Sequence, residues 1–138
     1  MTRTATALQA PVSSVMSWPV AMVDLTATMG DVAEALASNE IGSALVMAGE
    51  KFVGIVTERD LVTHLANSAN PDHLLAEEIV THTPVSVSPH DTVLVAARAM
   101  VEAGVRHLPV LDGDEAVGMV SIRDVTAVLL REVDEALG

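Results

Sequence analysis

Two stretches of the chain decide its fold: Gly54-Ile55-Val56-Thr57-Glu58-Arg59-Asp60 and Gly118-Met119-Val120-Ser121-Ile122-Arg123-Asp124, which lie 64 residues apart. Each stretch contains a short apolar run, then a hydroxyl residue, and then an aspartate three residues after that hydroxyl. Self-similarity at a fixed distance is the signature of a repeated structural unit. We therefore interpret the 138 residues as one unit used twice.

The similarity extends well beyond these stretches. Sliding the chain by 64 residues aligns 29–66 with 93–130 and gives ten identical positions, more than chance predicts even for a chain so rich in Ala and Val. We predict a first repeat over residues 14–66, a polar linker over 67–77 and a second repeat over 78–131.

Apolar spacing predicts the elements of each repeat. In the first repeat we expect a strand at 20–23, a helix at 29–37, strands at 44–47 and 52–56, and a helix from Thr57. In the second repeat the same elements fall at 85–87, 93–101, 108–111, 116–120 and from Ser121. The fold class is therefore α+β, with each repeat ordered β-α-β-β-α. A unit of about 50 residues cannot cover both faces of a sheet, so we expect the repeats to pack sheet to sheet with pseudo-two-fold symmetry.

Composition excludes several classes of protein. The formal charge is −12, from 19 acidic and 7 basic residues, and such a surface repels nucleic acid. The absence of cysteine removes disulfides, thiol nucleophiles and thiolate metal ligands. We find neither a signal peptide nor a membrane span, so we expect a cytoplasmic protein.

In the order and spacing of its motifs, the chain resembles a tandem pair of CBS domains, the family named after cystathionine β-synthase. Val15-Met16-Ser17 with Pro19 and Ile79-Val80-Thr81 with Pro84 resemble the opening strand of that domain. The segment Val105-Arg106-His107-Leu108-Pro109-Val110 is similar to its second strand. The two G-x-x-[T/S]-x-x-D motifs are similar to its ribose-binding motif.

The resemblance implies a regulatory Bateman module, not an enzyme. It implies a site for an adenosyl ligand such as AMP, ADP, ATP, NAD or S-adenosylmethionine, in clefts between the repeats, with no required cofactor. It also implies a homodimer that acts on a partner protein; this chain shows no catalytic, channel or transcription domain beside the repeats. The sequence residues expected to bind the ligand are Ser121, Asp124, Arg106, His107, Gly118, Arg123, Thr83, Pro84, Val85, Thr57, Asp60, Gly54 and Val20.

Each hydroxyl–aspartate pair has two readings. A hydroxyl followed three residues later by an acid is the capping box of a helix N-terminus. The same helix N-terminus can bind a phosphate, and the family match makes Asp60 and Asp124 the ribose anchors, with Thr57 and Ser121 holding phosphate or ribose oxygens. The two readings are compatible with each other.

The copies differ beside the motif. Arg106 and His107 precede a strand, where the arginine can clamp a phosphate and the histidine can donate a hydrogen bond. Gly42-Ser43 occupies the same place in the first repeat. We therefore expect the better site at Ser121 and Asp124.

The remaining candidates also have structural readings. A glycine in a strand, here Gly54 or Gly118, marks a bulge or a close backbone approach, although in the family it lies beside the ligand. Arg123 opposes the helix dipole, a small cost that indicates a partner. Thr83, Pro84 and Val85, with Val20 opposite, are expected to form an apolar slot for the base or simply to be core strand.

Three functional hypotheses follow, the third being a standalone regulator whose ligand is not a nucleotide. In the first, an adenine nucleotide bridges the repeats and changes their relative angle, which alters what a partner protein contacts. In the second, the chain is a ligand-free dimerisation or scaffold module whose hydroxyl–aspartate motifs are only helix caps. The histidines lack the spacing of a metal site, and we expect no metal and no catalysis.

Overall fold

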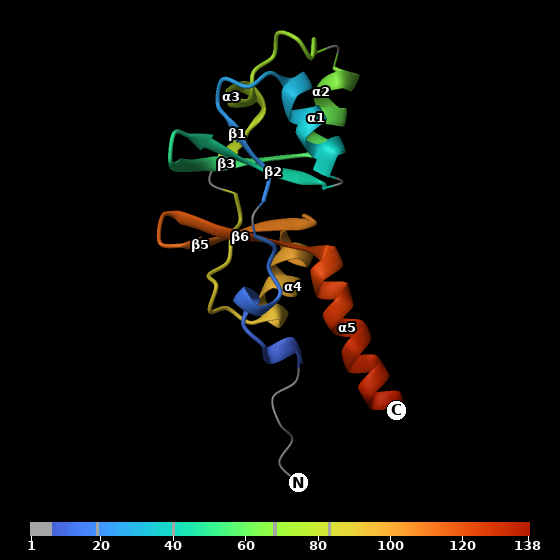
Figure 1. The fold of residues 1–138 in the computed structure, drawn as a ribbon. Helices are drawn as coiled ribbons and strands as arrows, with labels where there is room; N and C mark the ends of the chain where they lie inside the picture. Colours follow the sequence, from blue (N-terminus) through green and yellow to red (C-terminus); the bar gives the residue numbers. More distant parts are fainter. Residues whose placement is uncertain (1–6, 19, 40, 68, 83) are drawn as a thin grey trace. The chain divides into compact units, whose positions relative to one another are not determined.

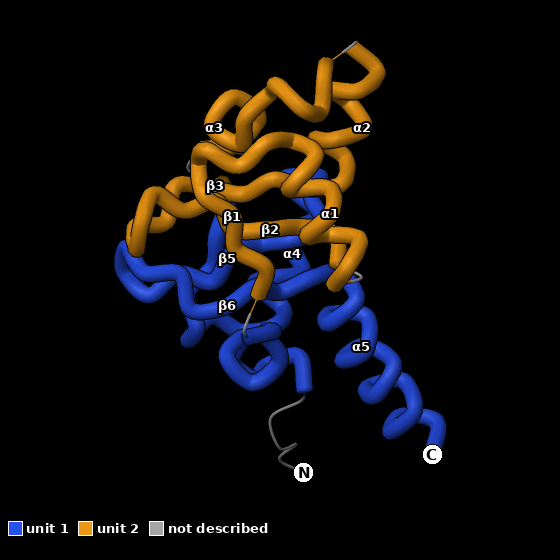
Figure 2. Tube along the Cα trace, turned by 45° about the horizontal axis from the view of Figure 1, so that its top comes forward, with its two compact units in different colours: residues 1–18, 85–138 blue, residues 19–84 orange. Residues whose placement is uncertain are grey.

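The computed structural model of the chain describes residues 7–18, 20–39, 41–67, 69–82 and 84–138. These fall into two compact units of mixed α and β structure, as the repeat predicts. Unit 1 combines Met1–Trp18 with Val85–Gly138, and unit 2 is Pro19–Pro84 (Figure 2). The compact units are therefore not identical with the contiguous repeats of the sequence.

Unit 2 contains a four-stranded sheet and three helices (Figure 1). Its elements are β1 (Met22–Asp24), α1 (Met29–Asn39), β2 (Ser43–Ala48), β3 (Lys51–Thr57), α2 (Glu58–Ala66), α3 (Ala76–Ile79) and β4 (Thr81–His82). The strand order is β1-β2-β3-β4; β1 runs parallel to β2 and the other pairs are antiparallel. The expected strand at 20–23 thus begins two residues later than predicted.

Unit 1 has the same plan around a shorter sheet. Its elements are the 3-10 turns η1 (Ala7–Gln9) and η2 (Val12–Ser14), helix α4 (Val93–Ala103), strands β5 (His107–Asp112) and β6 (Glu115–Ser121), and helix α5 (Ile122–Leu137). Val87 makes an isolated parallel bridge to Val110, and Ser17 makes an antiparallel one to Met119. The strand expected at 85–87 is therefore reduced to a single bridge.

The opening segments of the two repeats are exchanged between the units. Thr81, from the start of the second repeat, pairs with Ile55 in the sheet of unit 2. Ser17, from the start of the first repeat, pairs with Met119 in unit 1, and the Ser17 N–H donates to the Met119 carbonyl at 2.8 Å. Each unit is thus completed by a segment that belongs, by sequence, to the other repeat.

The exchanged segments contribute to the cores. Val12, from the N-terminal segment, is fully buried in unit 1, and Ala76 and Ile79 are buried in unit 2. The other members of the buried core cluster of unit 1 are Val87, Val93, Ala96, Met100, Leu108, Val110, Val120, Val125 and Val128. The other members of the core cluster of unit 2 are Met29, Val32, Leu36, Ala44, Val46, Val56 and Leu61. Aliphatic side chains therefore fill both cores, since the chain has one Phe, one Trp and no Tyr.

Residues of the predicted linker belong to unit 2 and bond to its first helix, α1. The N–H groups of Met29 and Gly30, in the first turn of α1, donate to the carbonyls of Leu74 and Pro71 at 2.7 and 2.9 Å. These bonds use backbone donors that a helix N-terminus leaves without intrahelical partners. Part of the stretch expected to be only a polar connector is thus a structural component of the unit.

The turns of the two hairpins each contain a glycine at positive φ. Gly49 has φ of 64° and Gly113 has φ of 63°, values that residues with a Cβ rarely adopt. Both hairpins also carry a register shift at the same point, between Val46 and Met47 and between Val110 and Leu111. The duplication therefore extends to the irregularities of the backbone.

Candidate functional site

Both predicted capping boxes are formed. At the start of α5 the Ser121 N–H donates to Asp124 Oδ2 at 2.7 Å, and the Asp124 N–H donates to Ser121 Oγ at 3.2 Å. At the start of α2 the corresponding distances between Thr57 and Asp60 are 2.8 and 3.2 Å. The structural reading of these motifs is therefore correct in both repeats.

Capping leaves part of each carboxylate free to bind something else. Within the described part of the chain, the hydrogen bonds to Asp60 and Asp124 all go to Oδ2. A carboxylate has about four acceptor positions, and both aspartates are half-buried rather than enclosed. The capping box and a bound hydroxyl group are thus compatible at the same residue.

Strand pairing places the basic pair beside the second box. His107, the first residue of β5, pairs with Ser121, the last residue of β6. The Arg106 carbonyl accepts a hydrogen bond from the Ile122 N–H at 2.8 Å, so its backbone is fixed to the first turn of α5. The Arg106 side chain is exposed and His107 is half-buried. The structure therefore brings together the residues predicted to form the better site.

The first repeat has the same backbone and different side chains. Ser43 pairs with Thr57, and the Glu58 N–H donates to the Gly42 carbonyl at 2.9 Å. The positions that hold arginine and histidine in unit 1 are therefore glycine and serine in unit 2. Ser43 is also only 5% exposed, which the sequence did not indicate. This box has no equivalent cation at its strand end.

Gly54 and Gly118 are explained by close backbone approach. A Cβ on Gly54 would lie 2.1 Å from the Thr81 carbonyl oxygen in β4. A Cβ on Gly118 would lie 2.6 Å from Met16 Sδ and 3.2 Å from the Ser17 carbonyl oxygen. The exchanged opening segments thus occupy the space above both glycines. Their role in ligand binding stays a prediction.

Other candidates are only partly placed. Arg123 is exposed in the first turn of α5, one residue from Asp124. Val20 and Pro84 are half-buried residues of unit 2, and Val85 in unit 1 is 49% exposed. Thr83 lies outside the described residues. The apolar slot for a base stays a prediction.

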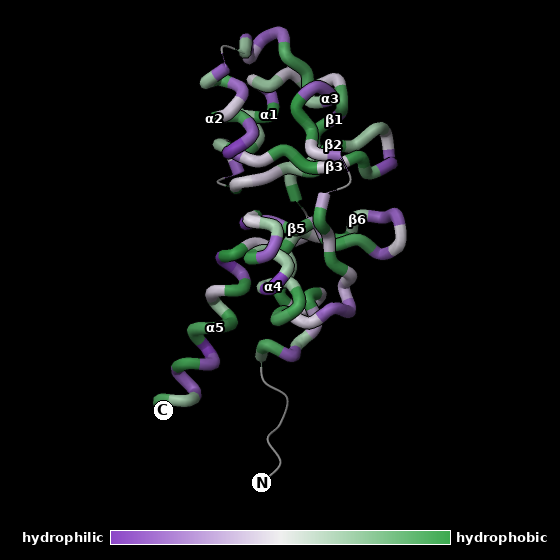
Figure 3. Tube along the Cα trace, turned by 180° about the vertical axis from the view of Figure 1, so that it is seen from behind, coloured by the Kyte–Doolittle hydropathy of each residue, from purple (hydrophilic) through white to green (hydrophobic). Residues whose placement is uncertain are grey.

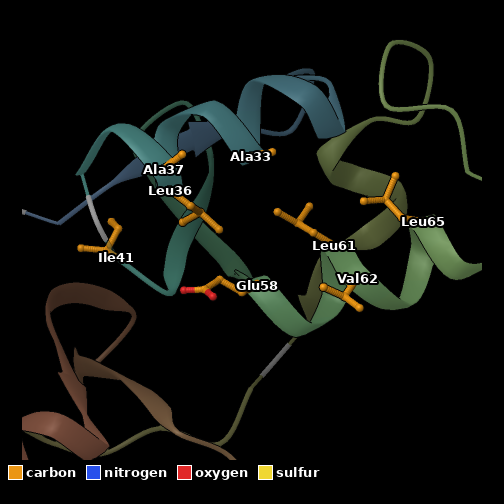
Figure 4. A pocket seen from close by; sticks show the side chains of 8 residues that line it. All are labelled: Ala33, Leu36, Ala37, Ile41, Glu58, Leu61, Val62 and Leu65. Carbon is orange, nitrogen blue, oxygen red and sulfur yellow. The ribbon is translucent and has the colours of Figure 1, made fainter.

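An open groove lies on unit 2, between α1 and α2 (Figure 4). Its volume is about 390 Å³, and its lining is apolar apart from one acid. The largest side chains that line it are Leu36, Ile41, Leu61, Val62, Leu65 and Glu58. No predicted ligand-binding residue lines this groove, so it is a surface distinct from the candidate site.

The described residues contain no group of three or more histidine, cysteine or acidic side chains placed to hold a metal ion. None of the helices in the described part of the chain has the length and apolar character that a membrane span requires.

Comparisons with known proteins identify the family. The CBS domain family model matches residues 12–67 and again residues 76–131. An uncharacterized protein encoded in a ribosomal RNA operon of Thermofilum pendens is 36% identical over 103 residues, which are 74% of this chain and 34% of that protein. An uncharacterized protein of Methanopyrus kandleri is 31% identical over 106 residues, 75% of this chain and 54% of that protein. The chain therefore spans between a third and just over half of these curated relatives.

Solved structures show the same fold. A CBS domain protein from Pyrobaculum aerophilum, solved in complex with AMP, has a TM-score of 0.80 and 33% identity to this chain. The match covers 88% of this chain and 97% of that one. With two family matches that together include both capping boxes, the chain belongs to the CBS domain family and contains two copies of the domain.

Proposed function

We propose that the chain is a regulatory module that binds an adenine nucleotide such as AMP at the N-terminus of α5. The observation that carries the proposal is the grouping of Arg106, His107, Ser121 and Asp124 on adjoining ends of β5, β6 and α5. The similar protein from Pyrobaculum aerophilum, complexed with AMP, supports the choice of ligand.

Each residue has a role that follows from its chemistry. The exposed Arg106 guanidinium can form two parallel hydrogen bonds to a phosphate. Asp124 keeps acceptor positions beyond those used in capping, which suit the two hydroxyls of a ribose. His107 adds a donor at the strand end, and the partial positive charge of the helix N-terminus favours an anion. ADP, ATP, NAD and S-adenosylmethionine offer the same adenosyl group.

The module is proposed to act as a homodimer on a partner protein, and to be regulatory rather than catalytic. Large apolar side chains left exposed on the helices support self-association; among them are Val62, Val101 and Leu130, at 65, 79 and 58% exposed. Exposed apolar side chains that cluster into one patch are characteristic of an interaction site.

Calorimetric titration and thermal unfolding with AMP, ADP, ATP, NAD and S-adenosylmethionine test the proposal. We expect at least one of these compounds to stabilise the protein, by about 2.7 kcal/mol when its concentration is 100 times the dissociation constant. Asp124→Ala should abolish most of the ligand-induced shift. The matched variant Asp60→Ala removes the same cap in the other repeat and should retain it.

A second candidate function is favoured by one observation: both capping boxes are complete without a ligand. In that case the chain is a dimerisation or scaffold module. Asp124→Ala would then only lower the free energy of unfolding. Neither the variant nor the unmodified protein would show a binding signal in any ligand titration. A response to any adenosyl compound that disappears in Asp124→Ala but not in Asp60→Ala rejects this candidate.

A further inference from the structure

The N-terminal segment of unit 1 is held to the rest of that unit at several points. Its first turn, η1, packs against both α4 and α5, and the Ala7 N–H donates to the carboxylate of Glu132. Farther along, the Val12 N–H donates to the carbonyl of Asp91 at 2.7 Å. Residues 7–17 thus run along unit 1 from α5 to β6, and we call them the strap.

The strap contributes side chains to the core of unit 1. Val12 is fully buried, and Leu8, Val15 and Met16 are half-buried and pack against the same cluster. The first described residues of the chain accordingly carry apolar side chains (Figure 3). Opening the strap would expose this apolar surface to water, and the hydrophobic effect therefore favours the closed arrangement.

The counterpart of the strap in unit 2 is residues 71–81, and it is attached differently. Both segments make an antiparallel bridge at equivalent positions, Pro11 and Leu75. The counterpart follows α2 in the sequence and ends in β4, so it never leaves unit 2. The strap is joined to residues 85–138 only through the whole of unit 2, and non-covalent contacts hold it within unit 1. The strap can therefore open locally without the rest of unit 1 unfolding.

The far end of the strap meets the strand that ends at Ser121. Two residues before that serine, Met119 exchanges two backbone hydrogen bonds with Ser17, of 2.8 and 3.2 Å. The Met16 side chain lies over Gly118, where a Cβ would come within 2.6 Å of its Sδ. In the described part of unit 1, β6 thus pairs with β5 on one edge and with the strap on the other. Since a two-stranded sheet is only marginally stable by itself, the strap supports the strand end beside the proposed ligand site.

We propose that the strap opens and closes locally, and that an adenine nucleotide at the N-terminus of α5 binds the chain with the strap closed. The proposal rests on the proposed ligand site and names its regulation. Ser121 and Asp124 must be held within about 0.5 Å of their binding geometry, and an open strap removes one partner of the strand that positions Ser121.

The coupling works in both directions. A ligand that binds the closed form better shifts the population toward that form. By reciprocity, any change that holds the strap open lowers the affinity for the ligand by the same factor. Occupancy of the site thereby controls the exposure of Val12 and the apolar residues beside it, and this exposure is a signal that a partner protein can detect.

Hydrogen exchange of the unmodified protein tests the coupling, with whichever of AMP, ADP, ATP, NAD and S-adenosylmethionine binds most tightly by calorimetry. At a concentration 100 times its dissociation constant, the Val12 and Ser17 amides should exchange about 10- to 100-fold more slowly, because the ligand stabilises the closed form. The matched control is the Ala76 amide, which holds the same place in the counterpart and donates to the Ala27 carbonyl at 2.7 Å. Its exchange should not change.

Slower exchange of the strap amides alone supports the proposal. Ligand binding with no change at these amides, or with an equal change at Ala76, would overturn the role of the strap and keep the ligand site. Failure of all five compounds to bind would overturn both the site and its coupling to the strap.

A pair of variants measures the reverse effect. Val12→Asp should hold the strap open, because an unpaired charge is not tolerated in an apolar core, and it should weaken the affinity for the same compound about tenfold or more. Ser13→Asp adds the same charge at the exposed neighbouring residue and should change the affinity less than about twofold. Equal affinities of the two variants would contradict the coupling. If circular dichroism shows that Val12→Asp does not fold, the exchange measurement on the unmodified protein decides.

Discussion

The N-termini of α2 and α5 have the same backbone arrangement and different chemical surroundings. Both begin with a capping box, and both follow a hairpin with a glycine at positive φ. In both, the first helical N–H donates to the carbonyl of the residue directly before the first strand of that hairpin. Around α5 the facing residues are Arg106 and His107; around α2 they are Gly42 and the buried Ser43.

This difference separates the contribution of the fold from the contribution of the site. The capping box is present in both units, so it belongs to the helix start and does not by itself indicate a ligand. Arg106 and His107 occur beside only one of the boxes. Because an anionic ligand needs a compensating charge where it loses water, the pair is the feature that makes one helix start a candidate site.

The largest expected effect concerns Gly54 and Gly118, which the opening segments of the repeats approach closely. Gly54→Ala should lower the free energy of unfolding by about 3 kcal/mol or more, because its Cβ would overlap the backbone of Thr81, which cannot move without breaking β4. Gly118→Ala should cost about 1–2 kcal/mol, since its closest neighbour is the end of the flexible Met16 side chain. Urea unfolding followed by circular dichroism gives both values.

The matched control for these variants is Gly113, which has positive φ and open space where a Cβ would lie. Gly113→Asn places a side chain where no atom lies within 4 Å, and asparagine tolerates the left-handed region. It should change stability by less than about 1 kcal/mol. Equal costs at Gly54 and Gly118 would contradict the difference between a backbone and a side-chain neighbour.

The next effect concerns Arg106 and His107. Replacing Arg106 by Gly and His107 by Ser reproduces the first repeat in the second. If AMP binds there, the double variant should weaken its affinity about 10- to 100-fold, because a hydrogen bond to a charged group contributes about 1.5–3 kcal/mol. Isothermal titration calorimetry measures the loss.

Arg98→Ala serves as the control, because it removes one exposed positive charge from α4 in the same unit. Its effect on AMP affinity should be less than about threefold at physiological salt, where charges beyond about 8 Å are largely screened. A loss as large as that of the double variant would mean that net charge, and not the local pair, governs binding.

A smaller effect is expected from removing each cap hydroxyl. Ser121→Ala and Thr57→Ala should each cost about 1 kcal/mol of unfolding free energy, since each leaves one N–H of the first helical turn without its acceptor. The near equality of the two costs, measured by urea unfolding, would show that the boxes are structurally equivalent. Costs that differ by more than about 1 kcal/mol would show that the surroundings also act on the cap.

The smallest effect concerns a turn that begins with Asp24 in unit 2 and with Ser88 at the equivalent place in unit 1. In unit 2 the Thr26 hydroxyl and N–H both donate to Asp24 Oδ2, at 2.6 and 3.0 Å. These bonds, with a weaker one from the Gly49 N–H, lower the pKa of Asp24. At the equivalent place in unit 1, Ser88 Oγ accepts from the His90 N–H.

A carboxylate with a depressed pKa in the folded state stabilises the fold above its unfolded pKa, and this stabilisation is lost as the pH falls through the folded value. Acidification should therefore weaken this turn in unit 2, whereas the hydrogen bond from the His90 N–H to Ser88 Oγ has no carboxylate as its acceptor. NMR titration should give a pKa for Asp24 below that of an aspartate in a short peptide. An ordinary or raised pKa would contradict the two hydrogen bonds from Thr26.

Most of the fold could be predicted because it depends on local patterns. The spacing of apolar residues located α1 and α4, and the hydroxyl–aspartate pairs located the starts of α2 and α5. The equivalence of Arg106-His107 with Gly42-Ser43 was also correct, because strand pairing aligns both with their boxes. These features involve residues close in sequence or in a single hairpin.

The exchange of the opening segments could not be predicted from the repeat. Ser17 and Thr81 are 64 residues apart, and so are their partners Met119 and Ile55. Each segment could therefore pair within its own repeat or with the other repeat. Both arrangements are equally consistent with the symmetry of the sequence. Short segments of two or three residues also carry too little pattern to specify a partner.

The exchange has a consequence for how the chain can fold as it is made. Unit 2 is contiguous, so all its parts are available once residue 84 has left the ribosome. The N-terminal segment, with Val12 destined for a core, must wait until β6 and α5 have been synthesised, several seconds later at about 5–20 residues per second. The segment is thus synthesised before unit 2 and reaches its native partner after unit 2 is complete, and its apolar residues are exposed to other nascent chains and chaperones in the interval.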